Sequence, residues 1–208
     1  MSSTAVLSIS SGFSAAVHIS ANVADHRRLT AVTKLLTILL IMSVALVGEN
    51  SLSPVYRYFI LAGLFFSLIG DAFLLFTHRF LHGLVAFLAA HVCYILAFTD
   101  RGFLIRLDIL PVFIPGAVIY FFIRNNLGRL RWPVVLYMVV ILVMVYEAFY
   151  RWRLYPTGPA YLAMSGAFLF AVSDSLLAVN RFGKPYRFAQ VSIMSTYYVA
   201  QWLIALSV

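Results

Sequence analysis

The chain consists almost entirely of apolar segments of membrane-spanning length, separated by short gaps that hold most of its charged residues. A transmembrane helix needs about 20 mostly apolar residues. The predicted spans are residues 4–24, 33–48, 55–76, 80–99, 108–124, 133–150, 158–179 and 187–207. Because 63% of the residues are hydrophobic and only 11% are charged, an ordinary soluble domain is excluded. We therefore predict an all-α, polytopic integral membrane protein with about eight transmembrane helices in a single transmembrane domain, residues 1–208.

Proline and serine mark particular spans. Prolines lie near the predicted starts of several later spans, where the missing N–H group has no helical partner to lose: Pro54, Pro111, Pro133, Pro159 and Pro185. The first span is the least typical of a membrane helix because it is rich in serine, with Ser8, Ser10, Ser11 and Ser14.

The formal net charge of +8 does not indicate a nucleic-acid partner. The basic residues lie in the gaps between apolar segments, where they set orientation and contact the headgroups of membrane lipids. The odd-numbered gaps hold ten Lys and Arg residues and the even-numbered gaps hold five, among them Arg101 and Arg106. By the positive-inside rule, we predict a protein of the inner cell membrane with its odd loops in the cytoplasm and both termini outside.

Two apolar segments each carry one aspartate in a similar frame: Asp71 in GLFFSLIGDAFLLF and Asp174 in GAFLFAVSDSLLA. A charged side chain at the centre of a membrane helix costs at least about 2.5–3.5 kcal/mol, so an intramembrane aspartate is a functional-site hypothesis by default. The matched frames predict an intramembrane site built from a carboxyl pair. The alternative is that each aspartate is satisfied separately, by Ser67 or Ser173 for example, as a contact between helices.

The two aspartates are predicted to lie at one depth, because each is five residues from the end of a span and both spans run in the same direction. At about 1.5 Å per residue this places both roughly 7–8 Å inside the odd-loop face. Basic residues surround that face: Lys34, Arg79, Arg181, Lys184 and Arg187. Cationic groups at headgroup level above carboxyl groups and hydrocarbon suit a molecule with an anionic head and an acyl or alkenyl tail.

Further polar residues follow the same spacing. Tyr94 lies 23 residues after Asp71, and Tyr197 lies 23 residues after Asp174. This agreement is compatible with a parallel four-plus-four duplication, and chance similarity among apolar segments is the alternative. His91, Tyr198 and Gln201 are also intramembrane, where they either line the site or form hydrogen bonds between helices.

A metal site is a weaker alternative. His78 and His82 have the i, i+4 spacing of metal ligands and, together with His91 and the aspartates, they could hold zinc. However, the chain has no compact HExxH string, and paired histidines are common at a membrane edge.

The phrases SLIGDAFLLF, AAHVCYILAF, GAFLFAVSDSLLAVNRF and TYYVAQWLI, in this order and spacing, resemble the YhhN-like lysoplasmalogenase family from about Lys34 to the C-terminus. One departure is that the family usually has Lys-Pro where this chain has Lys34-Leu35. The resemblance implies an eight-helix membrane enzyme that hydrolyses the vinyl ether bond of lysoplasmalogens to a fatty aldehyde and glycerophosphocholine or glycerophosphoethanolamine. It also implies that the catalytic aspartates are Asp71 and Asp174, with His91, Tyr94, Tyr197, Tyr198 and Gln201 around them.

This chemistry fits the residues. Vinyl ether hydrolysis begins with protonation of the β-carbon, which forms an oxocarbenium ion that water attacks. One protonated and one ionised carboxyl group divide this work, as in glycoside hydrolysis, so no metal or organic cofactor is needed. The residues alone do not assign the two roles. The alternatives are a proton-coupled transporter that uses the pair as a relay and a zinc-dependent intramembrane lipid hydrolase.

Overall fold

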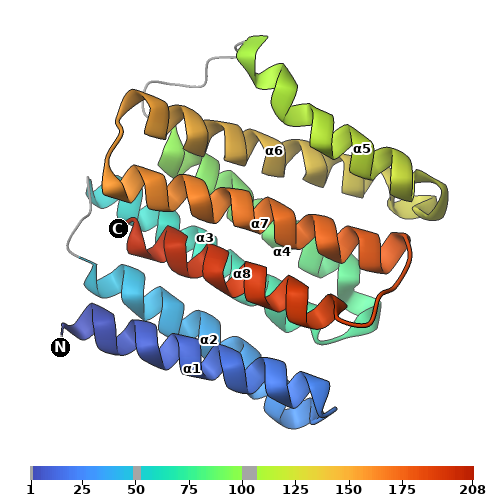
Figure 1. Ribbon diagram of the computed structural model, residues 1–208, viewed down its shortest axis with the longest axis horizontal. Coiled ribbons are helices and arrows are strands. Elements are labelled where there is room, and N and C mark those ends of the chain that lie inside the picture. The colour runs from blue at the N-terminus through green and yellow to red at the C-terminus, as the bar shows by residue number, and fades with distance from the viewer. Residues whose placement is uncertain (1, 49–52, 100–106) are drawn as a thin grey trace.

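The computed structural model describes residues 2–48, 53–99 and 107–208, and these ranges contain helices and no strand (Figure 1). The eight α-helices are α1 (Ser3–Val23), α2 (Arg27–Val47), α3 (Pro54–Leu74), α4 (Phe80–Phe98), α5 (Phe113–Ile123), α6 (Arg131–Leu154), α7 (Gly158–Phe182) and α8 (Ala189–Leu206). Short 3-10 turns are η1 (Thr77–Arg79), η2 (Leu107–Val112), η3 (Arg124–Asn126) and η4 (Gly128–Leu130). Each predicted span corresponds to one α-helix, so the all-α prediction is confirmed.

Two of the helices that begin at a side-chain cap are α3 and α7. Ser53 accepts a hydrogen bond from the backbone N–H of Tyr56, and Pro54 follows it in the first turn of α3. Thr157 accepts from the N–H of Ala160 in the same way at the start of α7. A side-chain oxygen at the N-cap satisfies an N–H group that has no partner within the helix, which fixes where these two helices start.

Some helix ends lie outside the predicted limits. α2 begins at Arg27 instead of residue 33, and α6 continues to Leu154 instead of ending at residue 150. Arginine has good helix propensity and a long stem that can reach the membrane surface, so an arginine does not end a helix. Arg101 and Arg106, which entered the count of loop charges, lie outside the described residues.

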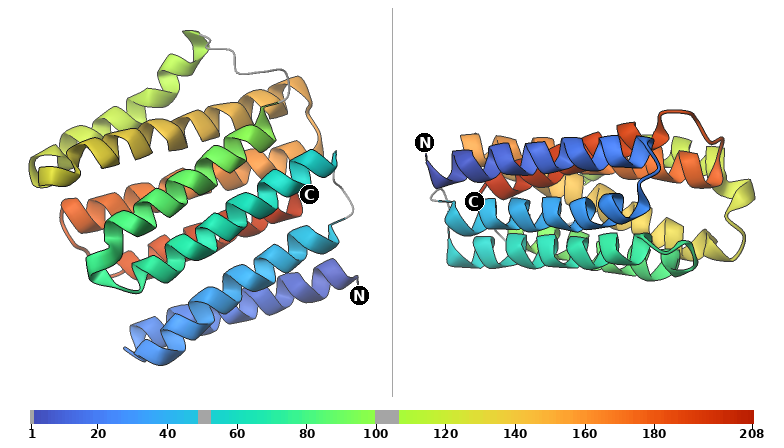
Figure 2. Two further views of the ribbon diagram at one scale, coloured as in Figure 1. Left: turned by 180° about the vertical axis from the view of Figure 1, so that it is seen from behind. Right: turned by 90° about the horizontal axis from the view of Figure 1, so that it is seen from below.

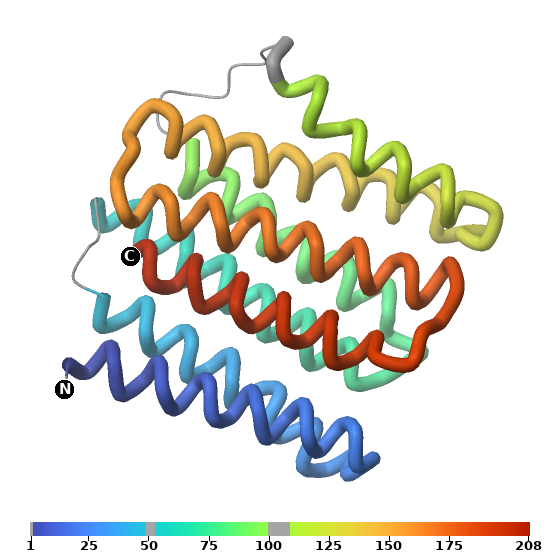
Figure 3. Tube along the Cα trace, in the orientation of Figure 1, coloured from blue at the N-terminus to red at the C-terminus, as the bar shows by residue number. Residues whose placement is uncertain are grey.

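The helices form two layers. Figure 2 shows α1, α8 and α7 in one layer and α2, α3 and α4 in the other, with α6 beside both α4 and α7. α5 lies outside these two layers and packs on α6 and α7. The two chain ends lie at one end of the bundle, and the odd-numbered connections lie at the opposite end (Figure 3).

The outer surface carries many apolar side chains. Large hydrophobic side chains are exposed on every helix, for example Phe13 at 73% and Val118 at 65%, as expected where the surrounding solvent is lipid. Seven of the described helical segments are long and apolar enough to cross a membrane. α8 is the exception, and its polar residues Tyr197, Tyr198 and Gln201 are accommodated because they are among the nine residues that it buries against neighbouring helices.

Several serines of α1, among them Ser8 and Ser14, face the protein. The Ser14 and Thr37 hydroxyl groups are 2.8 Å apart, and the Trp202 indole N–H donates to the Ser8 hydroxyl over 3.0 Å. His18 is 2% exposed, and its Nδ1 lies 3.0 Å from the Thr30 carbonyl oxygen. Polar side chains on an otherwise apolar helix thus bind α1 to α2 and α8, as interhelical hydrogen bonds do in membranes.

Glycine allows the closest approach in the core. A Cβ atom added to Gly63 would lie 2.3 Å from Cε1 of Tyr94, whose ring is fully buried. Gly63 on α3 therefore makes room for this tyrosine of α4, and the tyrosine hydroxyl donates to Oε1 of Gln201 on α8 over 2.7 Å. One glycine thus permits a contact that joins three helices.

We expect Gly63→Ala to lower the free energy of unfolding by about 1–3 kcal/mol, the usual cost of overpacking. Gly12→Ala is the matched control, because beyond its chain neighbours and the adjoining backbone of its own helix no described atom lies within 4 Å of an added Cβ there, and alanine is the better helix former. Thermal unfolding in detergent measures both. A Gly63→Ala protein as stable as the Gly12→Ala protein would contradict the packing argument.

Candidate functional site

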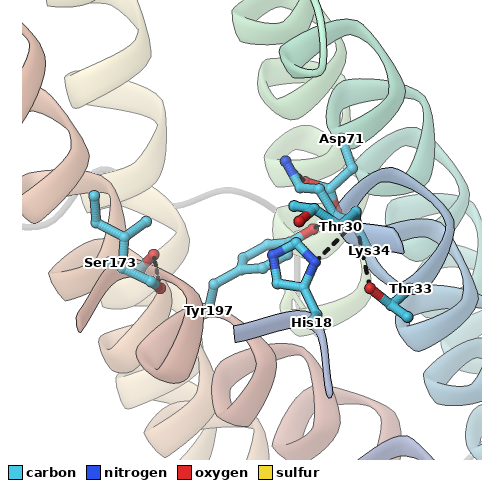
Figure 4. Close-up of polar contacts among 8 residues, drawn as sticks. His18, Thr30, Thr33, Lys34, Asp71, Ser173 and Tyr197 are labelled. Carbon is cyan, nitrogen blue, oxygen red and sulfur yellow. Dashed lines mark hydrogen bonds and ion pairs between the residues drawn. The ribbon is translucent and has the colours of Figure 1, made fainter. Parts of the chain in front are cut away.

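Asp71 lies three residues before the end of α3, and both of its carboxylate oxygens have partners (Figure 4). Nζ of Lys34, on α2, lies 3.0 Å from Oδ1, and the hydroxyl of Tyr197, on α8, donates to Oδ2 over 2.8 Å. The side chains of Lys34 and Asp71 are only 10% and 2% exposed. A buried charge is stable only when it is paired and hydrogen-bonded, so this arrangement suits an ionised Asp71.

Asp174 has a different environment. It lies on α7 and is half-buried, and its Oδ2 accepts a hydrogen bond from the hydroxyl of Tyr137 on α6. Among the described residues, no basic side chain lies within 4.0 Å of its carboxyl group. The two aspartates therefore differ in electrostatic environment, since of the two only Asp71 has a described basic side chain within 4.0 Å.

Both carboxyl groups line one polar cavity of about 450 Å³ at the odd-loop end of the bundle. Its walls also include four predicted site residues, namely Lys34, Ser173, Arg181 and Tyr197, and the polar residues Thr77, Asn180 and Gln190. The Ser173 hydroxyl donates to the Ile193 carbonyl of α8 over 3.0 Å. Arg181 is exposed, with its guanidinium carbon 3.9 Å from the centre of the Phe80 ring. The cavity thus combines two acids, two cations and several neutral donors.

The two aspartates reach this cavity from different positions along their helices. α3 ends at Leu74, three residues after Asp71, whereas α7 continues for eight residues beyond Asp174. The prediction placed each five residues from the end of its span. The shared cavity therefore arises from how the helices pack, and matched distances from the helix ends do not account for it.

Five other predicted site residues lie behind the cavity wall. Ser67, His91, Tyr94, Tyr198 and Gln201 are buried, and none of them lines the polar cavity. The His91 ring contacts the rings of Tyr137 and Phe170, with centroids 5.1 and 4.7 Å away, and neither of its nitrogens has a hydrogen-bond partner among the residues that the structure describes. These residues form the layer that supports the lining residues, and their role in substrate binding stays a prediction.

Arg79 lies outside the cavity. It is exposed, and its guanidinium carbon is 5.7 Å from the centre of the Phe76 ring. His78 and His82 are exposed close by, while His91 is buried within the bundle. In the described ranges, no group of three His, Cys, Asp or Glu side chains is placed to hold a metal ion.

The sequence reasoning did not identify Tyr137 as a site residue, although its hydroxyl is bonded to Asp174. A signal was present, because a buried tyrosine hydroxyl normally has a hydrogen-bond partner and Tyr137 lies within an apolar segment. His18 was also missed, and its ring packs edge-on against Tyr198 with centroids 5.6 Å apart. Both residues lie on spans that carry no aspartate, so the aspartate frame could not identify them.

A second cavity, of about 750 Å³, lies between α4, α5, α6 and α7. Leu74, Phe80, Phe87, Asp174 and Leu177 line both cavities, so the two are adjacent and Asp174 stands where they meet. Both volumes fall in the range of about 300–1,000 Å³ typical of small-molecule sites. The arrangement can hold an amphiphilic molecule with its polar part beside Asp71 and its apolar part beyond Asp174.

Comparison with known proteins identifies the family that this chain matches. Residues 29–208 match the model of the YhhN family. The lysoplasmalogenase TMEM86A of Bos taurus is 36% identical over 159 residues, which cover 71% of this chain and 64% of the relative. The lysoplasmalogenase TMEM86B of Homo sapiens is 33% identical over 152 residues, covering 73% of this chain and 64% of the relative. The match thus covers less than two thirds of each of these curated relatives.

A bacterial relative matches over a larger share of its length. The uncharacterized membrane protein YhhN of Shigella flexneri is 31% identical over 179 residues, which cover 85% of each chain. No solved structure matches this chain.

Proposed function

This chain belongs to the YhhN family, and on that premise we propose that it is a lysoplasmalogenase. The substrate would be a lysoplasmalogen, a lysophospholipid whose single chain is joined to glycerol by a vinyl ether bond. Hydrolysis gives a fatty aldehyde and glycerophosphocholine or glycerophosphoethanolamine. Its relatives TMEM86A and TMEM86B are named lysoplasmalogenases, which supports this activity. The observation that carries it is that two carboxyl groups line one polar cavity with an apolar cavity adjoining it.

The environments of the two aspartates suggest which is the acid. Asp71 faces Lys34 at 3.0 Å and accepts a hydrogen bond from Tyr197, so it serves as the carboxylate. Asp174 has no such cation within 4.0 Å among the described residues and lines the apolar cavity as well, so it serves as the protonated acid. Different environments commonly divide two carboxyl groups into acid and base in this way.

The proposed reaction proceeds in two stages. In the first, Asp174 gives its proton to the β-carbon of the vinyl ether, and the Asp71 carboxylate stabilises the oxocarbenium ion. Water adds to the cation and loses a proton to Asp71, which yields a hemiacetal. In the second, Asp71 returns that proton to the departing glycerol oxygen as the C–O bond breaks, and the hemiacetal hydroxyl gives its proton to Asp174. The aldehyde is released, and both aspartates return to their starting states.

Arg181 is our candidate for the phosphate contact. Lys34 is already paired with Asp71, whereas Arg181 is exposed and lines the same cavity. Guanidinium groups bind phosphate through paired, charge-assisted hydrogen bonds. We further propose that the cavity opens to the cytoplasmic side of the inner cell membrane, because the odd-numbered loops beside it carry the larger share of basic residues.

The decisive test is turnover of a lysoplasmalogen and of its saturated-ether analogue by the purified protein in lipid nanodiscs. We expect aldehyde only from the vinyl ether, because a saturated ether has no double bond to protonate. Aldehyde from neither lipid, together with uptake into proteoliposomes, would favour the transporter. Activity that a chelator abolishes and zinc restores would favour the zinc-dependent hydrolase.

A further inference from the structure

The apolar cavity has polar groups at one level only. Of the described side chains that line it, Tyr137, Asp174 and Ser175 are polar, and the hydroxyl of Tyr137 is bonded to Asp174. The remaining lining is aliphatic or aromatic. A ligand in this cavity thus meets hydrogen-bonding groups beside the proposed acid and hydrocarbon everywhere else.

The cavity extends from that level by about the depth of one leaflet toward the even-loop end, and on α7 it also reaches Phe182 on the other side of Asp174. On α7 it continues from Asp174 to Met164, ten residues away, and on α6 from Tyr137 to Phe149, twelve residues away. At about 1.5 Å per residue these lengths are about 15 and 18 Å. The hydrocarbon core of a bilayer is about 30 Å thick, so one lipid chain occupies about 15 Å of it.

The outer wall of the cavity is α5, at the edge of the bundle (Figure 1). This helix has 11 residues, of which only Gly116 and Ile123 are buried. Gly116 faces the cavity, and an added Cβ there would lie 2.5 Å from Cδ1 of Leu142. α5 thus separates the cavity from the surrounding lipid with one thin layer of side chains.

We propose that this apolar cavity holds the alkenyl chain of the substrate and sets the longest chain that the protein hydrolyses. The inference rests on the proposed function for the identity of the chain. The occupant is the chain of the substrate because the apolar cavity meets the polar cavity at Asp174. A lipid whose vinyl ether lies beside Asp174 has its headgroup on the Asp71 side and its chain in the apolar cavity.

The expected chain-length profile follows from the solvent of a membrane protein. A chain that moves from lipid into an apolar cavity exchanges one hydrocarbon environment for another, so added methylenes that fit change kcat/KM little. A chain too long for the cavity must displace packed side chains. The profile should therefore be flat up to a limiting length and then fall.

Two substitutions at different depths test the limit. Ala171 lines the cavity about 4–5 Å from the level of Asp174, and Met164 lines it about 15 Å away. With lysoplasmalogens of graded chain length, we expect Ala171→Phe to lower kcat/KM roughly 5- to 150-fold for medium and long chains while retaining short ones. Met164→Trp should affect only the longest. Ala117→Phe, at an exposed position of α5 outside the cavity, is the control.

A second measurement separates this inference from the proposed function. Saturated-ether lysophospholipids of the same chain lengths cannot be hydrolysed, and their binding can be followed by native mass spectrometry. If Ala171→Phe shortens the longest chain that binds but the wild type releases no aldehyde, the chain-binding role of the cavity is supported and the lysoplasmalogenase proposal is rejected. Turnover that both variants reduce equally for all chain lengths, or leave unchanged, would overturn the chain cavity.

Discussion

Asp174→Asn is expected to lower the rate of aldehyde release from a lysoplasmalogen by about 10²–10⁴-fold, the usual contribution of a general acid. An asparagine side chain has nearly the same shape and can still accept a hydrogen bond from Tyr137, so the fold should be retained. It has no acidic proton to give to the β-carbon. Aldehyde release, measured as initial rates with purified protein, therefore separates loss of the proton donor from loss of structure.

Asp71→Asn should cause a loss of similar size, because the amide neither stabilises the oxocarbenium ion nor accepts a proton from water. Asp25→Asn is the matched control. Asp25 lies in the connection between α1 and α2, its side chain is 88% exposed, and its φ of 55° is one that asparagine also adopts readily. The control should retain full activity. Near-normal turnover by Asp174→Asn in a folded protein would remove Asp174 from the mechanism.

The sequence was sufficient for the fold class because hydrocarbon leaves few choices. A spanning segment must satisfy its own backbone hydrogen bonds, so each apolar segment predicts a helix. Ends that carry arginine were less predictable, as at Arg27, because the helix continues where the backbone is already near water. The serines of α1 weakened its prediction for a related reason, since hydropathy does not show that Ser14 faces Thr37.

The contacts between helices could not be predicted from the spacing of residues in the sequence. The proposed duplication pairs Tyr94 with Tyr197, but the hydroxyl of Tyr197 is bonded to Asp71 while that of Tyr94 is bonded to Gln201. The donor to Asp174 is Tyr137, from a helix without an aspartate. The two aspartates therefore lack equivalent surroundings, and the duplication stays a prediction.

The apolar cavity could not be predicted from the sequence, for a different reason. Its lining consists of the residue types that also fill cores and face lipid. The sequence therefore looks the same whether these side chains pack together or enclose a cavity. Only the packing of α5 against α6 and α7 distinguishes these cases. By contrast, Lys34, Asp71 and Asp174 were predictable because charge within hydrocarbon is rare and therefore informative.

The ion pair between Lys34 and Asp71 provides the second large effect. Lys34→Met replaces the lysine with an unbranched apolar side chain and leaves the Asp71 carboxylate buried without its cation. Removing one partner of a buried pair typically costs about 3–5 kcal/mol. We expect a markedly lower unfolding temperature in detergent, because folding without the cation costs free energy whether Asp71 stays ionised or takes up a proton. We also expect a loss of aldehyde release of at least about 10²-fold, because a protonated Asp71 no longer serves as the base.

The double variant Lys34→Met/Asp71→Asn separates these two consequences. It removes both charges, so no unpaired ion remains in the bundle, and the hydroxyl of Tyr197 can still donate to the asparagine oxygen. Replacing a whole buried ion pair is often neutral for stability, so the unfolding temperature should return close to that of the wild type. Activity should stay absent because no carboxylate is restored. If the double variant is as unstable as Lys34→Met alone, Lys34 stabilises the bundle by contacts other than Asp71, and the argument that it holds Asp71 as the ionised partner fails.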